Sequence, residues 1–363
     1  MKQIKTILIG ISLVITTGVV NAQLLPSIDF LYGVRSDAKL LMQEYLRPYA
    51  NILGANLNAG WYNTAEPHKL GGFDITATFS IAFAPTSALS YNLTDLSALN
   101  ADIQGSTTVA PTIAGEMETL PQLVYTVTHE SETYELANIT HPNGAGLDWL
   151  PLPMAQASIG LIKGTDVSIR FVPETRIGDY GRLGLWGIGG KHSVSQWIPV
   201  VKSLKFINIS VQGGYTKVST MAKLNMLPIV EDDHPISTAN WDDQYMHMDI
   251  SGWTLNLIAS QSIPIITVYE GIGYSSSLVD LAVLGHYPIN TLVTTPDEFH
   301  EIGDVTYEAV LDPVPEGDMK FENFKNLRLN AGLRLKLGLL TIHYDFTRTL
   351  YSTHTAGIGI SFR

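Results

Sequence analysis

Residues 326–363 read NLRLNAGLRLKLGLLTIHYDFTRTLYSTHTAGIGISFR, and this stretch decides the fold class. Apolar side chains occupy every second position in three successive runs, Leu327 to Leu337, Leu340 to Phe346 and Ala356 to Phe362. Successive side chains of a β-strand point to opposite faces, so each run predicts a strand with one apolar face. Short turns connect the runs, and the three strands are expected to form an antiparallel meander.

The polar face of this meander indicates which kind of sheet it belongs to. A water-soluble sandwich also alternates, so the pattern alone leaves both classes open. Here the polar positions carry Arg, Lys, Asn, His and Asp beside Gly, Ser and Thr, as in the lumen of a barrel whose apolar face meets lipid. Phe362 places an aromatic at the end of the last strand, as outer-membrane barrels usually do. We therefore predict an all-β fold, a transmembrane antiparallel β-barrel.

The first 22 residues have the composition of an export signal. Lys2 and Lys5 precede an apolar run, and Val20-Asn21-Ala22 is a small-residue cleavage site. The run is short for a membrane anchor. We predict residues 1–22 as a signal peptide cleaved near Ala22, which directs the mature chain from Gln23 to the Gram-negative outer membrane.

Composition excludes several classes of protein. Charged residues are 15% of the chain, against ~25% in a typical soluble domain, while hydrophobic residues are 45%. No later segment is apolar for long enough to predict a transmembrane helix. The formal net charge of −12 argues against nucleic-acid partners. The chain has no cysteine, so neither disulfides nor a lipid-modified amino-terminal cysteine can contribute.

Residues 23–71 are predicted to form a helical plug. Ser36 is a candidate N-cap, and an apolar stripe follows at helical spacing. Pro48 is expected to end the regular helix. The helix is expected either to plug the lumen from the periplasmic side or to lie on a neighbouring surface. The stripe includes Leu41, Met42, Tyr45 and Leu46.

Residues 72–363 are predicted to form the barrel. The alternation gives 12 strands, or 14 if the hairpin formed by residues 122–139 belongs to the wall, and 14 is favoured. Either even number places both ends of the chain on the periplasmic side. The connections 85–153 and 221–242 are then long extracellular loops.

Two stretches carry a resemblance to known families. Residues 56–74, NLNAGWYNTAEPHKLGGFD, and residues 186–199, with WGIGGKH and QWIP, resemble a family of predicted Gram-negative outer-membrane proteins. More distantly, the plan is similar to the long-chain fatty acid transporter (FadL) family, which has a helical plug in a 14-stranded barrel. That resemblance implies a hydrophobic cargo and 14 strands, and it transfers no ligand-binding residue.

Several charged side chains are predicted to face the lumen. Mutual pairing of these side chains is the favoured expectation, and attraction of an anionic head group is the alternative. His343 and Asp345, two residues apart, are the one candidate for a catalytic pair, and catalysis is disfavoured because the sequence indicates no serine partner. No catalytic, cofactor or metal site is predicted, and calcium binding by the acidic stretch 231–243 is disfavoured. The lumen-facing candidates are Arg328, Arg334, Lys336, His343, Asp345, Asp74 and Arg170.

Three functions fit these predictions. The first is a plugged, porin-like outer-membrane barrel, similar to FadL, that binds or transports a hydrophobic or amphipathic small molecule and is not an enzyme. The second is an accessory or scaffold subunit of a secretion or assembly complex, which contacts envelope partners through its extracellular loops. The third, a hydrolase with its site at the rim, depends on His343 and Asp345.

Overall fold

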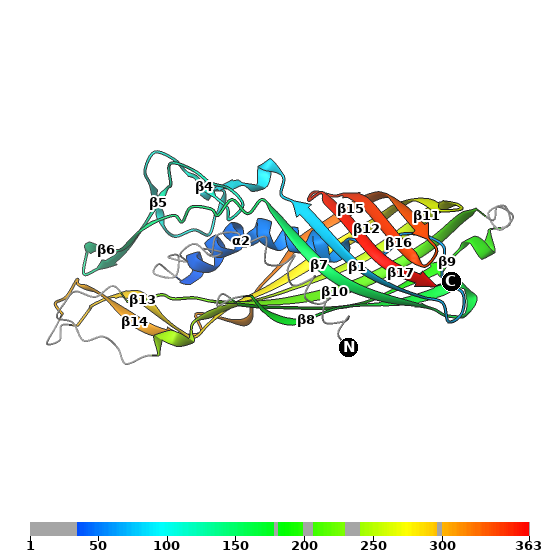
Figure 1. Cartoon of the computed structure of the whole chain (residues 1–363). Helices are drawn as coiled ribbons and strands as arrows, with labels where there is room; N and C mark the ends of the chain where they lie inside the picture. Colours follow the sequence, from blue (N-terminus) through cyan, green and yellow to red (C-terminus); the bar gives the residue numbers. More distant parts are fainter. Residues whose placement is uncertain (1–34, 178–180, 199–205, 229–239, 296–299, 363) are drawn as a thin grey trace.

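A computed structural model describes residues 35–177, 181–198, 206–228, 240–295 and 300–362. The predicted signal peptide and most of the acidic stretch therefore lie outside the described residues. Ten antiparallel strands form a closed barrel, and β1 pairs with β17 from Phe73↔Phe362 to Ala82↔Thr353 to complete it (Figure 1). The wall consists, in order around the barrel, of β1 (Phe73–Phe83), β17 (Thr353–Phe362), β16 (Leu340–Arg348), β15 (Val314–Leu337), β12 (Ile266–Leu284), β11 (Tyr245–Ile263), β10 (Ile207–Lys223), β9 (Gly181–Ser193), β8 (Thr165–Ile177) and β7 (Trp149–Gly160).

The outside of this wall carries an apolar belt. Leu333 and Ile342 expose 53% and 42% of their surface, and their register partners across β15, β16 and β17 are exposed too. Their sequence neighbours Arg334 and His343 are buried inside. Exposed apolar residues alternating with enclosed polar ones are the pattern of a transmembrane barrel. The all-β barrel prediction is thus confirmed.

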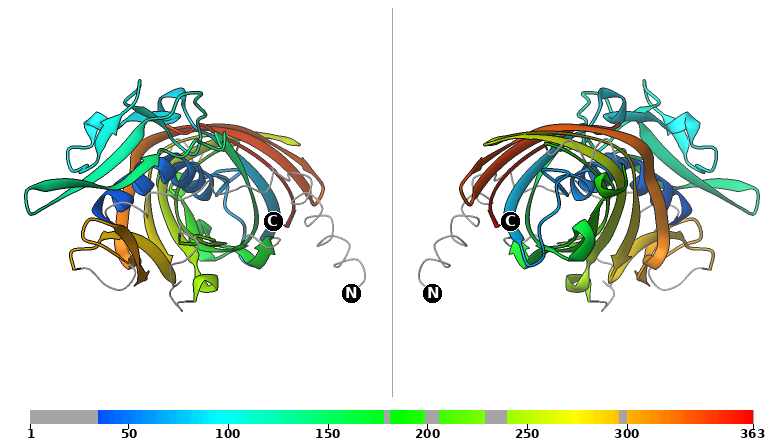
Figure 2. Two further views of the ribbon diagram at one scale, coloured as in Figure 1. Left: turned by 90° about the vertical axis from the view of Figure 1, so that its left-hand side faces the viewer. Right: turned by 90° about the vertical axis from the view of Figure 1, so that its right-hand side faces the viewer.

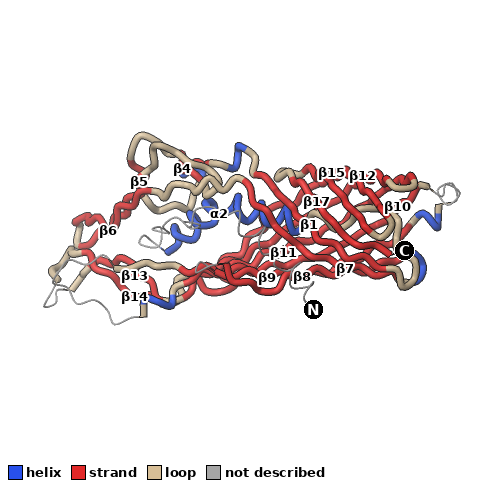
Figure 3. Tube along the Cα trace, in the orientation of Figure 1, coloured by secondary structure: helices blue, strands red, loops and turns tan. Residues whose placement is uncertain are grey.

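The two ends of the barrel differ in their connections. At one end, here called the turn end, hairpins turn at Lys163-Gly164 and Gly338, where the backbone has φ of 57°, 65° and 66°. At the other, the loop end, residues 84–148, 285–295 and 300–313 form folded extensions (Figure 3). The sequence assigns the turn end to the periplasm.

The predicted strand count of 12 to 14 is wrong, because the barrel has ten. Residues 122–139 form β5 (Gln122–His129) and most of β6 (Glu132–Thr140), which belong to a separate sheet with β3 (Asp102–Gln104). Two of the 12 strands expected from the alternation cover residues 281–294 and 305–311. Apart from residues 281–284, which end β12, they correspond to the hairpin β13 (His286–Leu292) and β14 (Val305–Leu311) beyond the loop end. Period-two alternation marks any half-buried strand, so it does not separate wall strands from hairpins outside the wall.

Residues 84–148 form a cap at the loop end. Besides the sheet of β3, β5 and β6, the cap contains a small sheet of β2 (Ser90–Asn92) and β4 (Val109–Pro111). The Ile113 amide donates to the Tyr45 carbonyl at 3.0 Å, which joins the cap to the helix. The cap therefore packs on the plug rather than standing free of the barrel.

The helix, α2 (Arg35–Asn58), continues ten residues past Pro48, so the predicted end at that proline is wrong. A proline inside a helix costs about 3 kcal/mol, and tertiary contacts of the following turns offset that cost. The helix lies at the loop end, where it contacts the inner side of the wall (Figure 2). The described helix therefore lies in the half of the lumen nearer the loop end. Among the described residues, no helix is long and apolar enough to cross a bilayer.

Candidate functional site

The barrel interior is divided into two zones of different chemistry. Toward the turn end, most inward side chains are polar. Toward the loop end they are apolar, and they form one buried cluster with α2 and the cap. Leu41, Met42, Tyr45 and Leu46 are all in this cluster, each at most 2% exposed. Six methionines belong to it: Met42, Met154, Met226, Met246, Met248 and Met319.

Arg170, on β8, fastens the carboxyl end of α2 inside the lumen. Its Nη1 donates to the Leu57 carbonyl at 3.0 Å and its Nη2 to the Ala59 carbonyl at 2.7 Å. The guanidinium also lies 3.7 Å from the centre of the Trp61 ring. The last carbonyls of a helix have no partner within the helix and carry the negative end of its dipole, so a cation fits there.

Arg328, on β15, holds the same turn from the opposite side. Its Nη1 donates to the Asn58 carbonyl and, at 3.0 Å, to the Thr254 hydroxyl. Thr216 donates to the Leu57 carbonyl at 3.3 Å. The two arginines therefore bind plug backbone rather than pairing with carboxylates as the sequence suggested. We call Arg170 and Arg328 the arginine clamp.

After the clamp, the chain runs through the lumen toward the turn end, with Trp61 packed on two wall glycines. A Cβ on Gly189 of β9 would lie 2.6 Å from the Trp61 ring, and one on Gly214 of β10 would lie 2.4 Å from it. No side chain fits there. The glycine-rich strand in the sequence thus forms a seat for this indole.

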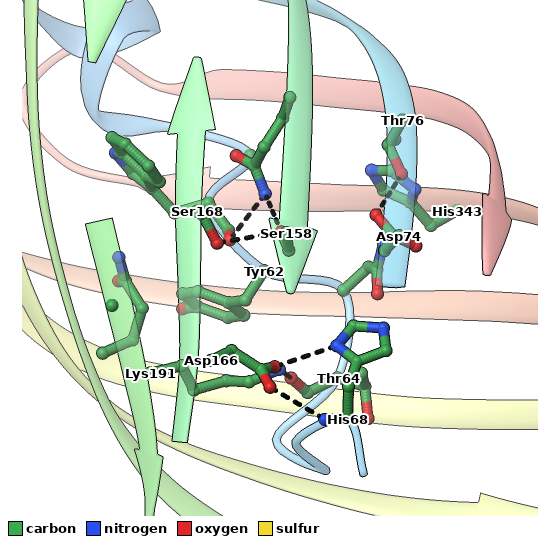
Figure 4. A pocket seen from close by; sticks show the side chains of 16 residues that line it. Tyr62, Thr64, His68, Asp74, Thr76, Ser158, Asp166, Ser168, Lys191 and His343 are labelled. Carbon is green, nitrogen blue, oxygen red and sulfur yellow. Dashed lines mark hydrogen bonds and ion pairs between the residues drawn. The ribbon is translucent and has the colours of Figure 1, made fainter. Parts of the chain in front are cut away.

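A small polar chamber lies between the plug and the turn end (Figure 4). Asp166 accepts from Lys191 at 3.1 Å, from the His68 ring at 3.1 Å and from the His68 amide at 2.9 Å. Asp74 accepts from the Thr76 hydroxyl at 2.6 Å. The chamber volume is about 30 Å³, enough for one or two waters at most. It therefore has no room for an organic ligand.

His343 and Asp345 do not form a catalytic pair at the rim. Both are buried in the half of the barrel near the turn end, and Asp345 instead accepts from Asn330 at 2.7 Å and Tyr269 at 3.1 Å. The ring nitrogens of His343 make no hydrogen bond to the described residues. Geometry thus removes the basis of the rim hydrolase. Of the other candidates, Arg334 and Asp74 are buried, and Lys336 is half-buried near the turn end.

A groove of about 280 Å³ lies in the wall near the edge of the belt that faces the loop end. A bulge in β8 between Val172 and Thr175 shifts the pairing with β9 there. The lining combines apolar residues, among them Phe171, Leu185 and Trp186, with the polar residues Glu174, Arg182 and His247. Its mixed lining suits an amphipathic molecule.

The cap has a buried polar centre beside the helix. His141 is fully buried, its Nδ1 bonds the Pro142 carbonyl at 2.7 Å, and its Nε2 bonds the Tyr91 hydroxyl at 2.8 Å. Burial lowers the pKa of His141 to about 4, because the imidazolium would lose its hydration. His141 is therefore neutral at pH 7.

Sequence reasoning found the lumen charges but missed what they bind. The role of Arg170 depends on carbonyls more than 110 residues away, and no local pattern encodes that. The contact of Trp61 with the wall is visible in the sequence, because glycines recur on β9 where a strand would otherwise carry side chains. The apolar zone is visible in the sequence as well, in the inward-facing Met246 and Met248 of β11.

The solved structures that are similar to this chain resemble it only weakly. No curated protein sequence matches this chain significantly. The crystal structure of the outer membrane protease OmpT from Escherichia coli is 6% identical with a TM-score of 0.30, covering 80% of this chain and 97% of that one. The β domain of the Bordetella autotransporter BrkA is 10% identical with a TM-score of 0.26, covering 80% and 99%.

A third structure, the toluene transporter TodX of Pseudomonas putida, is 8% identical with a TM-score of 0.16, covering 88% and 96%. With TM-scores of 0.30 and below, all three are weak likenesses. A family model described as a family of unknown function, DUF6588, matches residues 1–362. The chain therefore belongs to the DUF6588 family.

Proposed function

We propose that this protein is an outer-membrane β-barrel that binds hydrophobic or amphipathic small molecules in the loop-end half of its lumen, with α2 as a displaceable plug. The belt of exposed apolar residues supports the membrane location, and residues 1–22 have the composition of an export signal. The loop end then faces the outside of the cell and the turn end faces the periplasm.

The apolar, methionine-rich zone around α2 is the observation that carries this proposal. A pore for ions or sugars has a polar lumen throughout, whereas here the wall is apolar around most of α2, up to its last turn. Methionine is flexible and polarizable, so such a surface adapts to ligands of different shape. The helix would then occupy the space that a ligand takes.

The filled lumen requires that the plug move. The chamber at the turn end has a volume of only about 30 Å³, and α2 occupies the opposite zone. A ligand that enters from the loop end therefore has to displace α2 from the methionines. The outer turn of α2 is held at the surface, where Lys39 pairs with Asp318 of β15.

A reversible lock on α2 tests this proposal. In the cysteine-free chain, Lys39→Cys and Asp318→Cys joined by a cleavable bismaleimide would tie the helix to β15. We expect the double-cysteine protein in liposomes to bind a pyrene-labelled fatty acid before cross-linking. The cross-linked protein should not bind it, and cleavage of the cross-link should restore binding. Equal binding by both forms, or by neither, would contradict a displaceable plug.

A scaffold role is the second candidate. The folded cap and the β13–β14 hairpin offer an interaction surface. A scaffold needs no open channel, so a filled lumen is compatible with this role. A scaffold predicts a fixed envelope partner after purification in mild detergent. The absence of any partner from such a preparation would argue against this role.

A further inference from the structure

One carboxylate lies in the middle of the apolar belt. Glu270 is exposed on the outside of β12, between Val268 and Ile272 on the same face. Its register partners are Ala259 on β11 and Ala331 on β15. Within the described part of the chain, no hydrogen-bond donor or cation contacts this carboxylate. Small neighbours on both sides leave the Glu270 side chain accessible.

An ionisable side chain at this depth needs a partner. Val268, Ile272, Leu329 and Leu333 are all about half exposed around it, so lipid tails would surround the carboxylate if the face were free. Ionisable residues that face hydrocarbon are costly and mark functional contacts. This step rests on the membrane location proposed above, and not on ligand binding.

On the loop-end side of the belt, the same face continues as a patch that contains both positively and negatively charged side chains. Lys217 pairs with Asp249 at 2.6 Å and Lys320 pairs with Asp280 at 3.4 Å. All four side chains belong to β10, β11, β12 and β15. Because both signs are present, the patch can be complementary to a copy of itself.

The face is large enough for a stable contact. β12 has 19 residues, so at about 3.4 Å per residue, and with three strands spaced about 4.8 Å apart, the face covers roughly 900 Å². Stable interfaces bury about 800 Å² on each partner.

We propose that two copies of this chain associate through the face of β11, β12 and β15, with the Glu270 side chains meeting at the two-fold axis. A two-fold interface brings the same residue together from both copies, so the carboxyl groups can share a proton and replace lipid by a hydrogen bond. The hollows at Ala259 and Ala331 receive large side chains of the second copy. No further component is needed to neutralise the site.

Single-cysteine cross-linking tests the dimer, because the chain has no native cysteine. Val268→Cys and Ile272→Cys keep Glu270 and lie beside the proposed axis. Ile169→Cys, on the outward face of β8, is the matched control. In membranes treated with a short bifunctional maleimide, we expect covalent dimers at positions 268 and 272 and none at 169.

Substitution of Glu270 then tests its part in the contact. In the Val268→Cys background, Glu270→Gln should keep the cross-link because two amides can pair, and Glu270→Lys should reduce it to the level of the position 169 control. Monomers at positions 268 and 272, or cross-linking unaffected by Glu270→Lys, would overturn the proposal. Ready labelling of the Ile169→Cys variant by a membrane-impermeant maleimide would instead show that the belt is not in lipid, so the two failures are distinguishable.

Discussion

Replacing Arg170 by methionine should release the plug from the wall. The Ala59 carbonyl loses its 2.7 Å donor, and the Leu57 carbonyl keeps only the 3.3 Å bond from Thr216. A buried acceptor without a partner costs about 1–3 kcal/mol, and the cation–π contact with Trp61 adds up to about 2 kcal/mol. We expect the free energy that holds the plug to fall by about 3 kcal/mol.

Hydrogen–deuterium exchange measures this change directly. A loss of about 3 kcal/mol corresponds to roughly a hundredfold faster exchange of amides that open with the plug, those of residues 50–62. Arg348→Met is the matched control, because Arg348 is exposed on β16, away from the plug. Arg170→Lys should fall between the wild type and Arg170→Met, since an ammonium cannot serve both carbonyls in the fork geometry of a guanidinium.

The clamp also predicts coupling between its two members. Arg328→Met removes the donor to the Asn58 carbonyl of the same turn. The free energy lost in the double variant should be less than the sum of the two single losses, because the turn has already detached after the first substitution. Exchange in Arg170→Met that matches Arg348→Met would refute the reasoning, because it would mean that the clamp does not hold α2.

Three further predictions concern the seat of the indole, the cap and the wall. Gly214→Ala should destabilise the barrel by about 1–3 kcal/mol in urea unfolding, because its Cβ would lie 2.4 Å from Trp61, whereas Gly213→Ala, with nothing nearer than 3.8 Å, should be neutral; equal effects would contradict this account of the seat. The cap should lose up to about 3 kcal/mol of stability as the pH falls from 6.5 toward 4. The reason is that His141 takes up a proton at its ordinary pKa of 6.5 in the unfolded cap, but only at a pKa of about 4 in the folded cap. Protease resistance of residues 84–148 reports this loss, and His141→Gln should abolish the pH dependence. Leu333→Arg should lower the free energy of unfolding in a bilayer by about 2–4 kcal/mol, and Leu350→Arg, in the loop-end turn, should not; equal tolerance of both would argue against a lipid contact at Leu333.

The barrel was predictable because its signal is local. Leu333 and Arg334, or Ile342 and His343, differ in exposure simply because adjacent residues of a strand point to opposite faces. The turn at Lys163-Gly164 depends on a local feature too, since a positive φ favours glycine.

The errors arose where tertiary contacts decide. Pro48 stays within a helix because the residues after it are buried in the lumen and held by Arg170 and Arg328. Residues 122–139 alternate like wall strands, although they pair with β3 of the cap. The partner of Arg170 was out of reach as well, because backbone carbonyls carry no sequence signal.

Spin-label accessibility of the belt tests the central claim most directly, namely that the exposed apolar side chains contact lipid. Single cysteines at Leu333, Ile342 and Ile358 in the cysteine-free chain can each carry a nitroxide, with Thr133 in β6 of the cap as the aqueous reference. The account predicts that the three belt labels in liposomes are relaxed strongly by oxygen and weakly by a water-soluble nickel chelate, and that Thr133 shows the reverse. Belt labels that respond to nickel as Thr133 does, or that neither reagent reaches, would contradict it.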